Sequence, residues 1–486
     1  MTLVLAVALL ILEAHVPRSK PNPPAVPDPA AQTLLQTLHP HAAGVDVGAN
    51  EMWVAAPPGS VAQTPPDHPP ELPSHVRCFG TFTADLGAIA AFLRAAAVTT
   101  VAMEATGIYW VPLYDSLEAE GFEVLLVDPQ QTSRAPGRPK TDVEDCQWIQ
   151  RLHSLGLLCA SFRPEEGIRV WRSYQRHRAT LVGDAARHIQ RMQKALEQMN
   201  VKLTEVVSDV TGQTGLSIIK AIVRGERDAA KLAALRDWRF EQTEATIALA
   251  LQGTWAAEHL FALKQELSLY EFYHQQIAEC DRAIEEHLRT LALTDEAAPK
   301  AKKRLRKPKA NEPHFEARQR LFQMAKVDLT AIEGIETNTA MVVLSEIGTD
   351  MDRWPSVKHF GNWLGLAPCD KKTGGKVKSA ATRPGVNRAA MALRLAARCL
   401  QRSKSALGAF FRRIASRRGV PKAITATAYK LARLIYAMLK HGQEYVAQGM
   451  EAYEQAYRER AVRNLKRKAE EMGLEVVEKA AAQPST

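Results

Sequence analysis

The spacing of apolar positions changes along the chain. Between residues 41 and 160, short apolar runs bounded by Gly and Pro alternate with stretches in which apolar residues recur every three or four positions. The first pattern predicts strands, and the second predicts helices. The expected elements are, in order, a hairpin at 44–56, a strand near 77–83, a helix near 85–97, a strand ending at Glu104, a helix near 109–120, a strand at 122–128 and a helix that begins at Asp142.

A hairpin followed by alternating strands and helices is the element order of an RNase H-like fold, in which helices cover a sheet. We therefore predict an α/β domain of this type at 41–160. A Pro-rich loop at 57–73 and a basic loop, RAPGRPK, at 134–140 interrupt the pattern. Residues 1–40 hold a short apolar run and then six prolines, and we expect a disordered extension there.

Residues 161–298 form a segment rich in Ala, Leu, Gln, Glu and Arg, with apolar residues at three- and four-residue spacing. This pattern predicts a helical arm, built as a coiled coil or a helical hairpin, and arms of this kind often mediate oligomerisation. A basic linker is expected at 299–315, with seven Lys or Arg and no acid between Pro299 and Lys309. It is either a solvated linker or a nonspecific tether for nucleic acid.

A second folded region is predicted at 316–450, mainly helical, followed by a charged helix and tail at 451–486. Its first part, 328–348, contains two expected helical stretches around EGI at 333–335. A small glycine at such a turn allows backbone N–H groups to approach phosphate, as in a helix-hairpin-helix. An ordinary helical turn explains the same residues equally well.

Charge is distributed unevenly, although the whole chain carries a formal net charge of +10 and has a pI of 9.2. No acid occurs between Asp370 and Glu444, a stretch that contains 18 Lys or Arg. Solvated faces normally mix both signs, so this stretch predicts contact with a polyanion such as nucleic acid. No Cys-x-x-Cys pair is present, which argues against a zinc ribbon. The apolar run at 3–12 is too short to span a bilayer, and no membrane partner is expected.

Four carboxylates carry the candidate chemistry. Asp46 lies in the hairpin GVDVGANEMWVAA, and Glu104 ends the run VTTVAMEATG. Asp142 and Asp145 open a helix three residues apart, so that both lie on one face. Carboxylates from two strand ends and one helix start can converge, and Mg²⁺ takes such oxygen ligands. Two Mg²⁺ ions would activate the attacking oxygen and stabilise the leaving oxygen of a phosphodiester.

Each of these acids alone has an ordinary explanation, because Asp is frequent at turns and at helix starts. Their joint order, on strand, strand and helix, favours the metal site. Three nearby acids fit the pattern less well: Glu51, Asp128 and Glu144. Glu144 points away from the face that Asp142 and Asp145 share, and we expect it to be solvated.

Five motifs, taken together, resemble one known family: GVDVGAN, MEATGIYW, KTDVEDCQWI, EGIETNTAMVVLSEIG and WLGLAPCDKKTGGKVKSAATRPGVNRAA, in that order. Over residues 41–465 the chain resembles the DEDD transposases of the IS-one-ten and IS-eleven-eleven insertion-sequence family, the bridge-RNA-guided recombinases. The resemblance implies a RuvC-like (RNase H-like) domain, a coiled-coil arm and a C-terminal transposase domain. It also implies Mg²⁺ or Mn²⁺, donor and target DNA, a guide RNA, assembly as dimers or tetramers, and a cytoplasmic, nucleoid-associated location.

The resemblance assigns Asp46, Glu104, Asp142 and Asp145 to the DEDD metal ligands. The family's nucleophilic serine follows a Gly-Leu-x-Pro motif, present here as GLAP at 365–368, but the aligned residue is Thr373. Threonine keeps the hydroxyl, and its extra methyl crowds the oxygen and stiffens χ1. The nearest alternative hydroxyl belongs to Ser379, six residues off register.

In the mechanism that the resemblance implies, a composite site between subunits holds both the carboxylates and the hydroxyl. The Thr373 hydroxyl attacks a DNA phosphodiester and forms a covalent protein–DNA link, while metal held by the carboxylates stabilises the developing charge. The segment CDKKTGGKVKSAATRPGVNRAA, at 369–390, is expected to be a loop. We assign its basic residues to nucleic-acid binding, and not to catalysis: Lys371, Lys372, Lys376, Lys378, Arg383 and Arg388.

Three other functions stay open. A hydrolytic nuclease or resolvase of RuvC type would use water as the nucleophile, and Thr373 would be irrelevant. A sugar kinase or ATPase shares the fold and an Asp-x-Gly turn such as DVG at 46–48, but we find no second glycine-rich phosphate loop. A decayed descendant that only binds DNA or RNA would fit the replacement of serine by Thr373.

Overall fold

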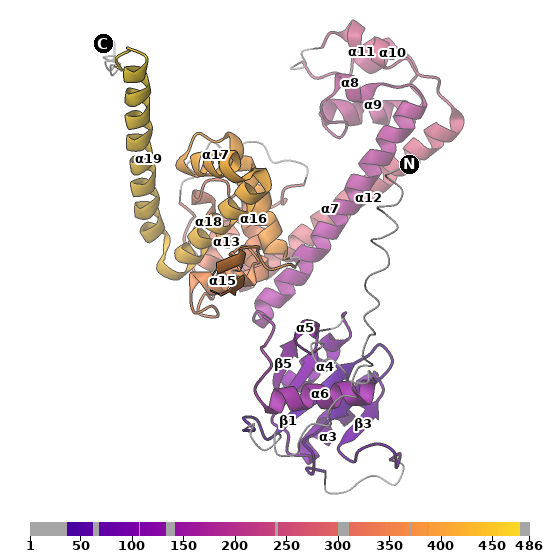
Figure 1. Cartoon of the computed structure of the whole chain (residues 1–486). Coiled ribbons are helices and arrows are strands. Elements are labelled where there is room, and N and C mark those ends of the chain that lie inside the picture. Colours follow the sequence, from indigo (N-terminus) through magenta and orange to yellow (C-terminus); the bar gives the residue numbers. More distant parts are fainter. Residues whose placement is uncertain are drawn as a thin grey trace, which may run out of the picture. The chain divides into compact units, whose positions relative to one another are not determined.

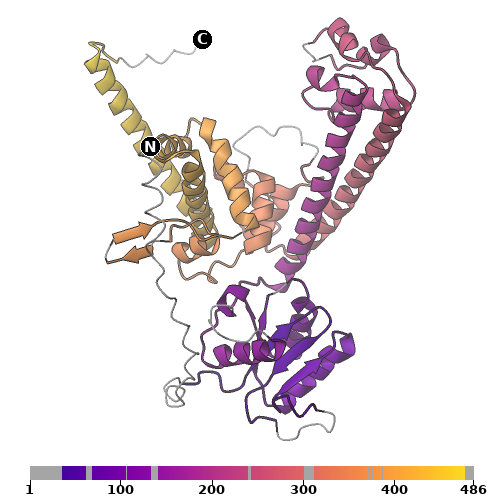
Figure 2. The same cartoon turned by 45° about the vertical axis from the view of Figure 1, so that its right-hand side comes forward.

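The computed structural model describes residues 36–61, 68–105, 107–132, 141–238, 242–299, 311–369, 371–374, 376–385 and 387–476 (Figures 1 and 2). The chain divides into two compact units, Met1–Arg163 and Pro164–Thr486. Most of the expected N-terminal extension, the basic loop at 134–140 and most of the basic linker lie outside the described residues. The finer domain boundaries predicted from the sequence stay predictions.

A five-stranded mixed sheet, in the order β3-β2-β1-β4-β5, forms the centre of the first unit. Its strands are β1 (Ala42–Val47), β2 (Met52–Ala55), β3 (Val76–Phe79), β4 (Thr100–Glu104) and β5 (Glu123–Val127). β2 is antiparallel to β1 and β3, whereas β1, β4 and β5 are parallel. The carboxyl ends of β1 and β4 therefore meet at one edge of the sheet. This topology, with its helices, confirms the predicted RNase H-like fold.

The helices of this unit are α3 (Thr83–Ala95), α4 (Trp110–Ala119), α5 (Pro129–Thr132) and α6 (Asp142–Ser154). Successive strand residues point to opposite faces of a sheet. Val45 and Met103 belong to the core that includes α3 and α4, whereas Ala102 belongs to the cluster that includes Ile149 of α6. By this alternation Asp46, one residue after Val45, and Glu104, one after Met103, lie on the face that α6 covers.

Two side chains of α6 fasten it to the strands below. The Gln150 amide donates to the Ala42 carbonyl at 3.1 Å. His153 Nε2 lies 2.9 Å from Thr100 Oγ1 in a buried hydrogen bond. At the other end of the helix, the Thr141 hydroxyl accepts a hydrogen bond from the Glu144 amide and caps the helix start. These contacts fix both the position and the direction of the helix that carries Asp142.

The second unit begins with a pair of long antiparallel helices, α7 (Glu166–Gln198) and α12 (Ala257–Thr290), which lie side by side in Figures 1 and 2. Between their far ends, four short helices form a lobe with its own core: α8 (Leu203–Val206), α9 (Gln213–Val223), α10 (Ala229–Ala233) and α11 (Glu244–Ala250). The pair is a helical hairpin, one of the two predicted forms. The heptad packing of a coiled coil stays a prediction.

A buried ion pair joins α7 to α12 midway along the hairpin. Arg178 Nε lies 2.5 Å from Asp281 Oδ1, and the side chains are 4% and 1% exposed. The other Asp281 oxygen accepts from the His314 amide at 3.2 Å, and Arg178 Nη2 donates to the Asn311 carbonyl at 3.2 Å. Buried charges persist only when they are paired and hydrogen-bonded, and removing one partner strands the other. The pair therefore sets the register of the two helices.

The rest of the second unit is a mainly helical bundle, as predicted. Its elements are α13 (Ala317–Ala325), η1 (Leu329–Ala331), α14 (Thr337–Ile347), α15 (Val357–Trp363), β6 (Lys371–Thr373), β7 (Lys376–Ser379), α16 (Arg388–Cys399), η2 (Leu400–Arg402), α17 (Ala406–Arg418), α18 (Val420–His441) and α19 (Gln443–Glu471). The bundle joins the hairpin through Arg176, whose guanidinium donates to both carboxylate oxygens of Glu346 at 2.8 and 2.7 Å.

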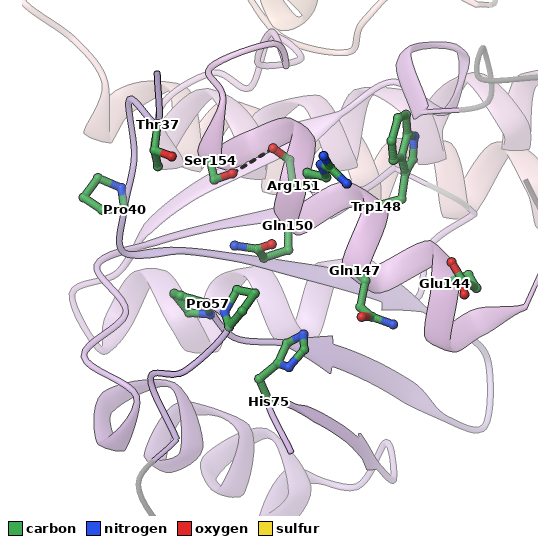
Figure 3. A pocket seen from close by; sticks show the side chains of 11 residues that line it. Thr37, Pro40, Pro57, His75, Glu144, Gln147, Trp148, Gln150, Arg151 and Ser154 are labelled. Atoms are coloured by element: carbon green, nitrogen blue, oxygen red, sulfur yellow. Dashed lines mark hydrogen bonds between the residues drawn. The ribbon is translucent and has the colours of Figure 1, made fainter. Parts of the chain in front are cut away.

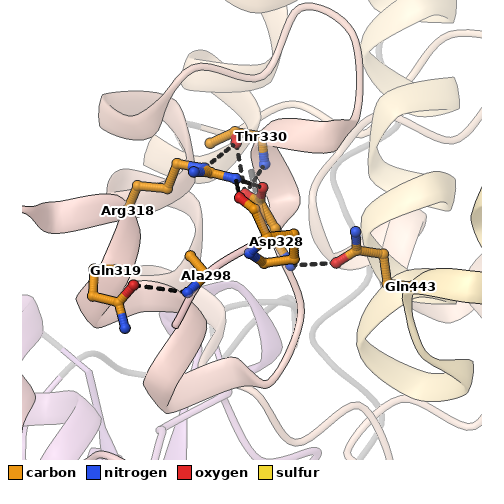
Figure 4. A network of polar contacts seen from close by, with 7 residues as sticks. Ala298, Arg318, Gln319, Asp328, Thr330 and Gln443 are labelled. Atoms are coloured by element: carbon orange, nitrogen blue, oxygen red, sulfur yellow. Dashed lines mark hydrogen bonds and ion pairs between the residues drawn. The ribbon is translucent and has the colours of Figure 1, made fainter. Parts of the chain in front are cut away.

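A polar network holds the start of the bundle together (Figure 4). The buried Asp328 carboxylate accepts from Arg318 Nε at 3.1 Å, and the same nitrogen lies 3.1 Å from the Thr330 hydroxyl. The Asp328 amide donates to the Gln443 side chain of α19 at 3.0 Å. The network thus connects α13, η1 and α19. The charges of Arg318 and Asp328 therefore have a structural role within the bundle.

Two details differ from the sequence-based expectation. The first stretch of 328–348 is a single 3-10 turn, η1, so only α14 follows the glycine turn as an α-helix. Gly334 has φ +90°, and a Cβ there would lie 3.0 Å from Leu400 Cγ. Packing and backbone conformation therefore require this glycine, whereas its phosphate contact stays a prediction. The other difference is a short hairpin, β6–β7, where an irregular basic loop was expected.

Candidate active site

Three of the four predicted carboxylates converge. One oxygen from each of Asp46, Asp142 and Asp145 lies within 4.8 Å of the other two. Asp46 and Asp145 are partly buried, and Asp142 is exposed. All the donors are hard carboxylate oxygens, which is the ligand type that Mg²⁺ and Mn²⁺ prefer. The arrangement therefore fits a divalent cation at the carboxyl end of β1.

The close approach of α6 to β1 depends on Gly44. A Cβ at this position would lie 2.2 Å from the backbone nitrogen of Gln150 and 2.4 Å from the Cys146 carbonyl oxygen. No other residue fits there without a shift of the helix. Asp46 lies two residues further along the strand and Asp145 one residue before Cys146. The missing side chain thus allows the helix to bring its acids to the strand.

Glu104, the fourth predicted ligand, lies outside this group of three. It ends β4, the neighbour of β1, and is partly buried on the face that α6 covers. The Thr132 hydroxyl, at the end of α5, donates to Glu104 Oε2 at 3.0 Å. The Trp148 indole of α6 donates in turn to the Thr132 carbonyl at 3.0 Å. A chain of hydrogen bonds therefore runs from α6 to the Glu104 carboxylate.

Two cysteines near the carboxylate cluster have raised thiol pKa values. Burial raises the pKa of Cys146 to about 12, and the charges of Asp46 and Asp142 add to the rise. Burial also raises the pKa of Cys78 to about 11, with Glu51 and then Asp142 contributing. The smaller, electrostatic part of the rise in pKa comes from carboxylates, and the same negative charge attracts a divalent cation.

Glu144 lies where the sequence predicted, exposed and away from the cluster. It lines a pocket of about 580 Å³ on another side of α6, together with His75, Gln147 and Trp148 (Figure 3). Burial lowers the pKa of His75, although a hydrogen bond between its ring and the Gln147 side chain opposes the shift. None of the three clustered carboxylates lines this pocket. The carboxylate cluster and the pocket are therefore separate features of α6.

Thr373 ends strand β6 and pairs with Lys376 across the turn. Gly374, with φ +55°, follows it, and Thr373 is exposed. The hairpin therefore presents the hydroxyl at its tip beside a lysine. The exposed residues of the predicted binding set are Lys376, Lys378, Arg383 and Arg388. The side chains of Lys371 and Lys372 lie outside the description.

An RNase H-like sheet that gathers carboxylates at its strand ends, in one chain with an acid-free basic region, defines an enzyme of the class that cuts and joins nucleic-acid strands. Two family models match the chain. The model described as Transposase matches residues 43–201, and the model described as Transposase IS116/IS110/IS902 family matches residues 328–412. The chain belongs to the IS110 family of DEDD transposases, and its substrate is DNA.

The first matched segment contains all four acids, and the second contains Thr373 and the basic residues around it. No curated protein matches the chain. Among the described residues, no helix is both long and apolar enough to cross a bilayer.

Sequence reasoning missed two residues of this site. Gly44 could have been found, because glycine inside a strand often marks the close approach of another backbone. Thr132 had no such signal, because its partner Glu104 lies 28 residues earlier and meets it only in the fold.

Proposed function

We propose that this transposase cuts and rejoins DNA through a covalent protein–DNA intermediate, with the Thr373 hydroxyl as nucleophile and a guide RNA to select the sites. The observation that carries the proposal is the convergence of Asp46, Asp142 and Asp145 in a chain whose second family-matched segment presents an exposed hydroxyl between lysine and glycine. Carboxylates this close to one another repel, and a bound divalent cation would offset that repulsion.

The carboxylates act as ligands in this proposal. Asp46, Asp142 and Asp145 would hold one Mg²⁺ or Mn²⁺, and Glu104 would complete a second ligand set with them. When bound, such ions supply positive charge that stabilises the pentacoordinate phosphate and the leaving oxygen.

Thr373 supplies the attacking oxygen. Its Oγ1 forms a bond to phosphorus, the bond from phosphorus to the leaving DNA oxygen breaks, and the hydroxyl proton passes to solvent. The free hydroxyl at the end of another DNA strand then attacks this phosphorus, the bond from phosphorus to Thr373 Oγ1 breaks, and the threonine hydroxyl is regenerated as the two strands are joined. Lys376 and Lys378 lie next to the turn and can hold the phosphate by charge. Each step exchanges one phosphodiester bond for another. The cutting and rejoining of DNA therefore require no external energy source.

A nicked DNA substrate tests this mechanism, because loss of a short strand after cleavage prevents religation. With cognate guide RNA, DNA and Mn²⁺, we expect a DNA adduct that protease removes. Omission of the divalent ion should abolish it. Cleavage without any adduct would identify a hydrolytic nuclease of RuvC type instead. Nucleic-acid binding without cleavage or adduct would identify a decayed descendant.

The guide RNA and the oligomer are separate parts of the proposal. The acid-free stretch at 371–443 supports a polyanionic partner, and both DNA and RNA satisfy that chemistry. Expression together with the noncoding DNA that flanks the gene should yield a copurifying structured RNA. Recovery of the same protein with no specific RNA, and with full activity, would contradict RNA guidance. Sedimentation with and without that RNA measures whether the dimer or tetramer forms.

A further inference from the structure

A hydrogen bond from a neighbouring element holds the Glu104 carboxylate. Thr132 Oγ1 lies 3.0 Å from Glu104 Oε2 and 2.9 Å from the Pro129 carbonyl oxygen. Thr132 is 7% exposed, so water does not compete freely for its hydroxyl. The contact therefore belongs to the interior of the site and not to its rim.

One hydroxyl has one hydrogen, and here two oxygens can accept it. An ionised carboxylate is the stronger acceptor, because charge-assisted hydrogen bonds are shorter and stronger than neutral ones. Thr132 therefore donates to Glu104 whenever that carboxyl is ionised. A β-branched side chain also has few χ1 rotamers. The hydroxyl is thus a stiff support, and the Glu104 carboxylate has limited freedom to turn.

The support is itself tied to the helix that carries two of the acids. The Trp148 indole donates to the Thr132 carbonyl at 3.0 Å, and Trp148 lies three residues after Asp145 on α6. On the other side, the Gln131 side chain exchanges two hydrogen bonds with Cys159, at 2.9 and 2.8 Å. Glu104 is therefore positioned relative to α6, and not only relative to its own strand.

We infer that Thr132 is a positioning residue for the fourth carboxylate. It orients Glu104 toward the cation held by Asp46, Asp142 and Asp145, in the way that outer hydrogen bonds orient metal-binding carboxylates elsewhere. The inference rests on the proposed metal-dependent function. It adds a residue that neither the acid pattern nor the family resemblance assigns.

The test is a Mn²⁺ titration of the full-length protein, read by electron paramagnetic resonance, with thermal unfolding of the metal-free protein alongside. Thr132→Val keeps the shape and removes the donor, and it should weaken Mn²⁺ binding about 10-fold or more. Thr132→Ser keeps the donor and should remain within about 3-fold of the unsubstituted protein. Thr132→Ala is the second donor-free variant and should behave as the Val variant does.

A double-mutant cycle separates positioning from general stability. If Thr132 acts through Glu104, then Thr132→Val in a Glu104→Gln background should cause no further loss of Mn²⁺ affinity. Equal losses in both backgrounds, or full Mn²⁺ affinity in the Val and Ala variants, would overturn the inference while leaving the metal site intact. If the unsubstituted protein binds no Mn²⁺, the proposed metal site itself fails, and this inference fails with it.

Discussion

The backbone nitrogen of Gln150 lies 2.2 Å from where a Cβ of Gly44 would stand. Real Cβ atoms do not come so close to another backbone, so α6 rests directly on β1 only because this strand position has no side chain. The lack of a side chain at Gly44 therefore sets the distance between β1 and α6. This distance in turn sets the spacing of the three clustered carboxylates. This relationship leads to the first prediction.

Gly44→Ala should push α6 away from β1 while leaving every acid in the sequence. Because a misplacement of about 1 Å can reduce a rate about 100-fold, we expect DNA cleavage to fall by about that factor or more. Mn²⁺ affinity and the melting temperature should fall too. Gly87→Ala in α3 is the matched control, since a Cβ there has nothing within 4 Å, and it should be neutral or stabilising. Unchanged cleavage by the Gly44 variant would disprove the dependence.

Asp142→Ala should abolish divalent-ion-dependent cleavage, because it removes one of the three converging carboxylates. Glu144→Ala removes the same charge from the same helix turn but from outside the cluster, and its cleavage should stay within about 3-fold of the unsubstituted rate, as for surface substitutions. The comparison uses one cleavage assay at saturating Mn²⁺. Equal loss in both variants would point to net charge and not to ligation.

Thr373→Val should stop formation of the protease-sensitive DNA adduct, because it removes the hydroxyl and nearly preserves the shape. Thr373→Ser should keep or raise adduct formation, since it retains the oxygen and removes a crowding methyl. Gel analysis with the nicked substrate measures both. An adduct that persists in the Val variant would exclude Thr373 and make Ser379 the next candidate.

Binding of DNA and RNA by the intact protein should weaken steeply with salt, because Lys and Arg of the acid-free stretch displace counterions from phosphates. Replacing the exposed pair Lys376 and Arg383 with Gln should lower the slope of log affinity against log salt by about 2, if each contacts one phosphate. Filter binding between low and high salt gives the slope. A flat dependence would contradict the assignment of this surface.

His153 makes the stability of the first unit depend on pH. Burial, with His39 nearby, lowers its pKa to about 4 from the ordinary 6.5, so the folded state binds fewer protons than the unfolded state between these values. The contribution of neutral His153 to the stability of the folded state is therefore full above pH 6.5, and it is lost as the pH falls toward 4. From about pH 7 to pH 5 the contribution falls by about 2 kcal/mol.

The control for this prediction is His153→Gln, which cannot titrate. Carboxylates also contribute to acid sensitivity, so the quantity to compare is the difference between the two proteins. Hydrogen exchange of the α6 amides at both pH values measures the local free energy of opening. If the unsubstituted protein and the Gln variant lose equal stability between the two pH values, His153 is not the titrating group.

Much of the site followed from local sequence pattern. Asp46 and Glu104 sit at the ends of apolar strands, and strand alternation alone places both on one face of the sheet. The i,i+3 spacing of Asp142 and Asp145 likewise fixes their common helix face. What pattern could not supply was Thr132, since a hydrogen bond between residues distant in the sequence depends on how α5 and β4 pack.

The hairpin that carries Thr373 was missed for a different reason. Two glycines between short segments are a turn signal, and the pairing of Thr373 with Lys376 leaves a two-residue turn. The flanking residues, however, are mostly lysines and not alternating apolar residues, so the strand pattern was hidden.

The ion pair between Arg178 and Asp281 has a consequence for length. Because slipping one helix past the other would strand a buried charge, at a cost of about 3–5 kcal/mol, the hairpin has one allowed register. Its 34-residue helix α12 spans about 50 Å at 1.5 Å per residue, which is the length of about 15 base pairs of DNA. Because seven residues make about two turns of an α-helix, adding or removing seven residues from both helices would change the length of the hairpin while keeping its packed faces in phase.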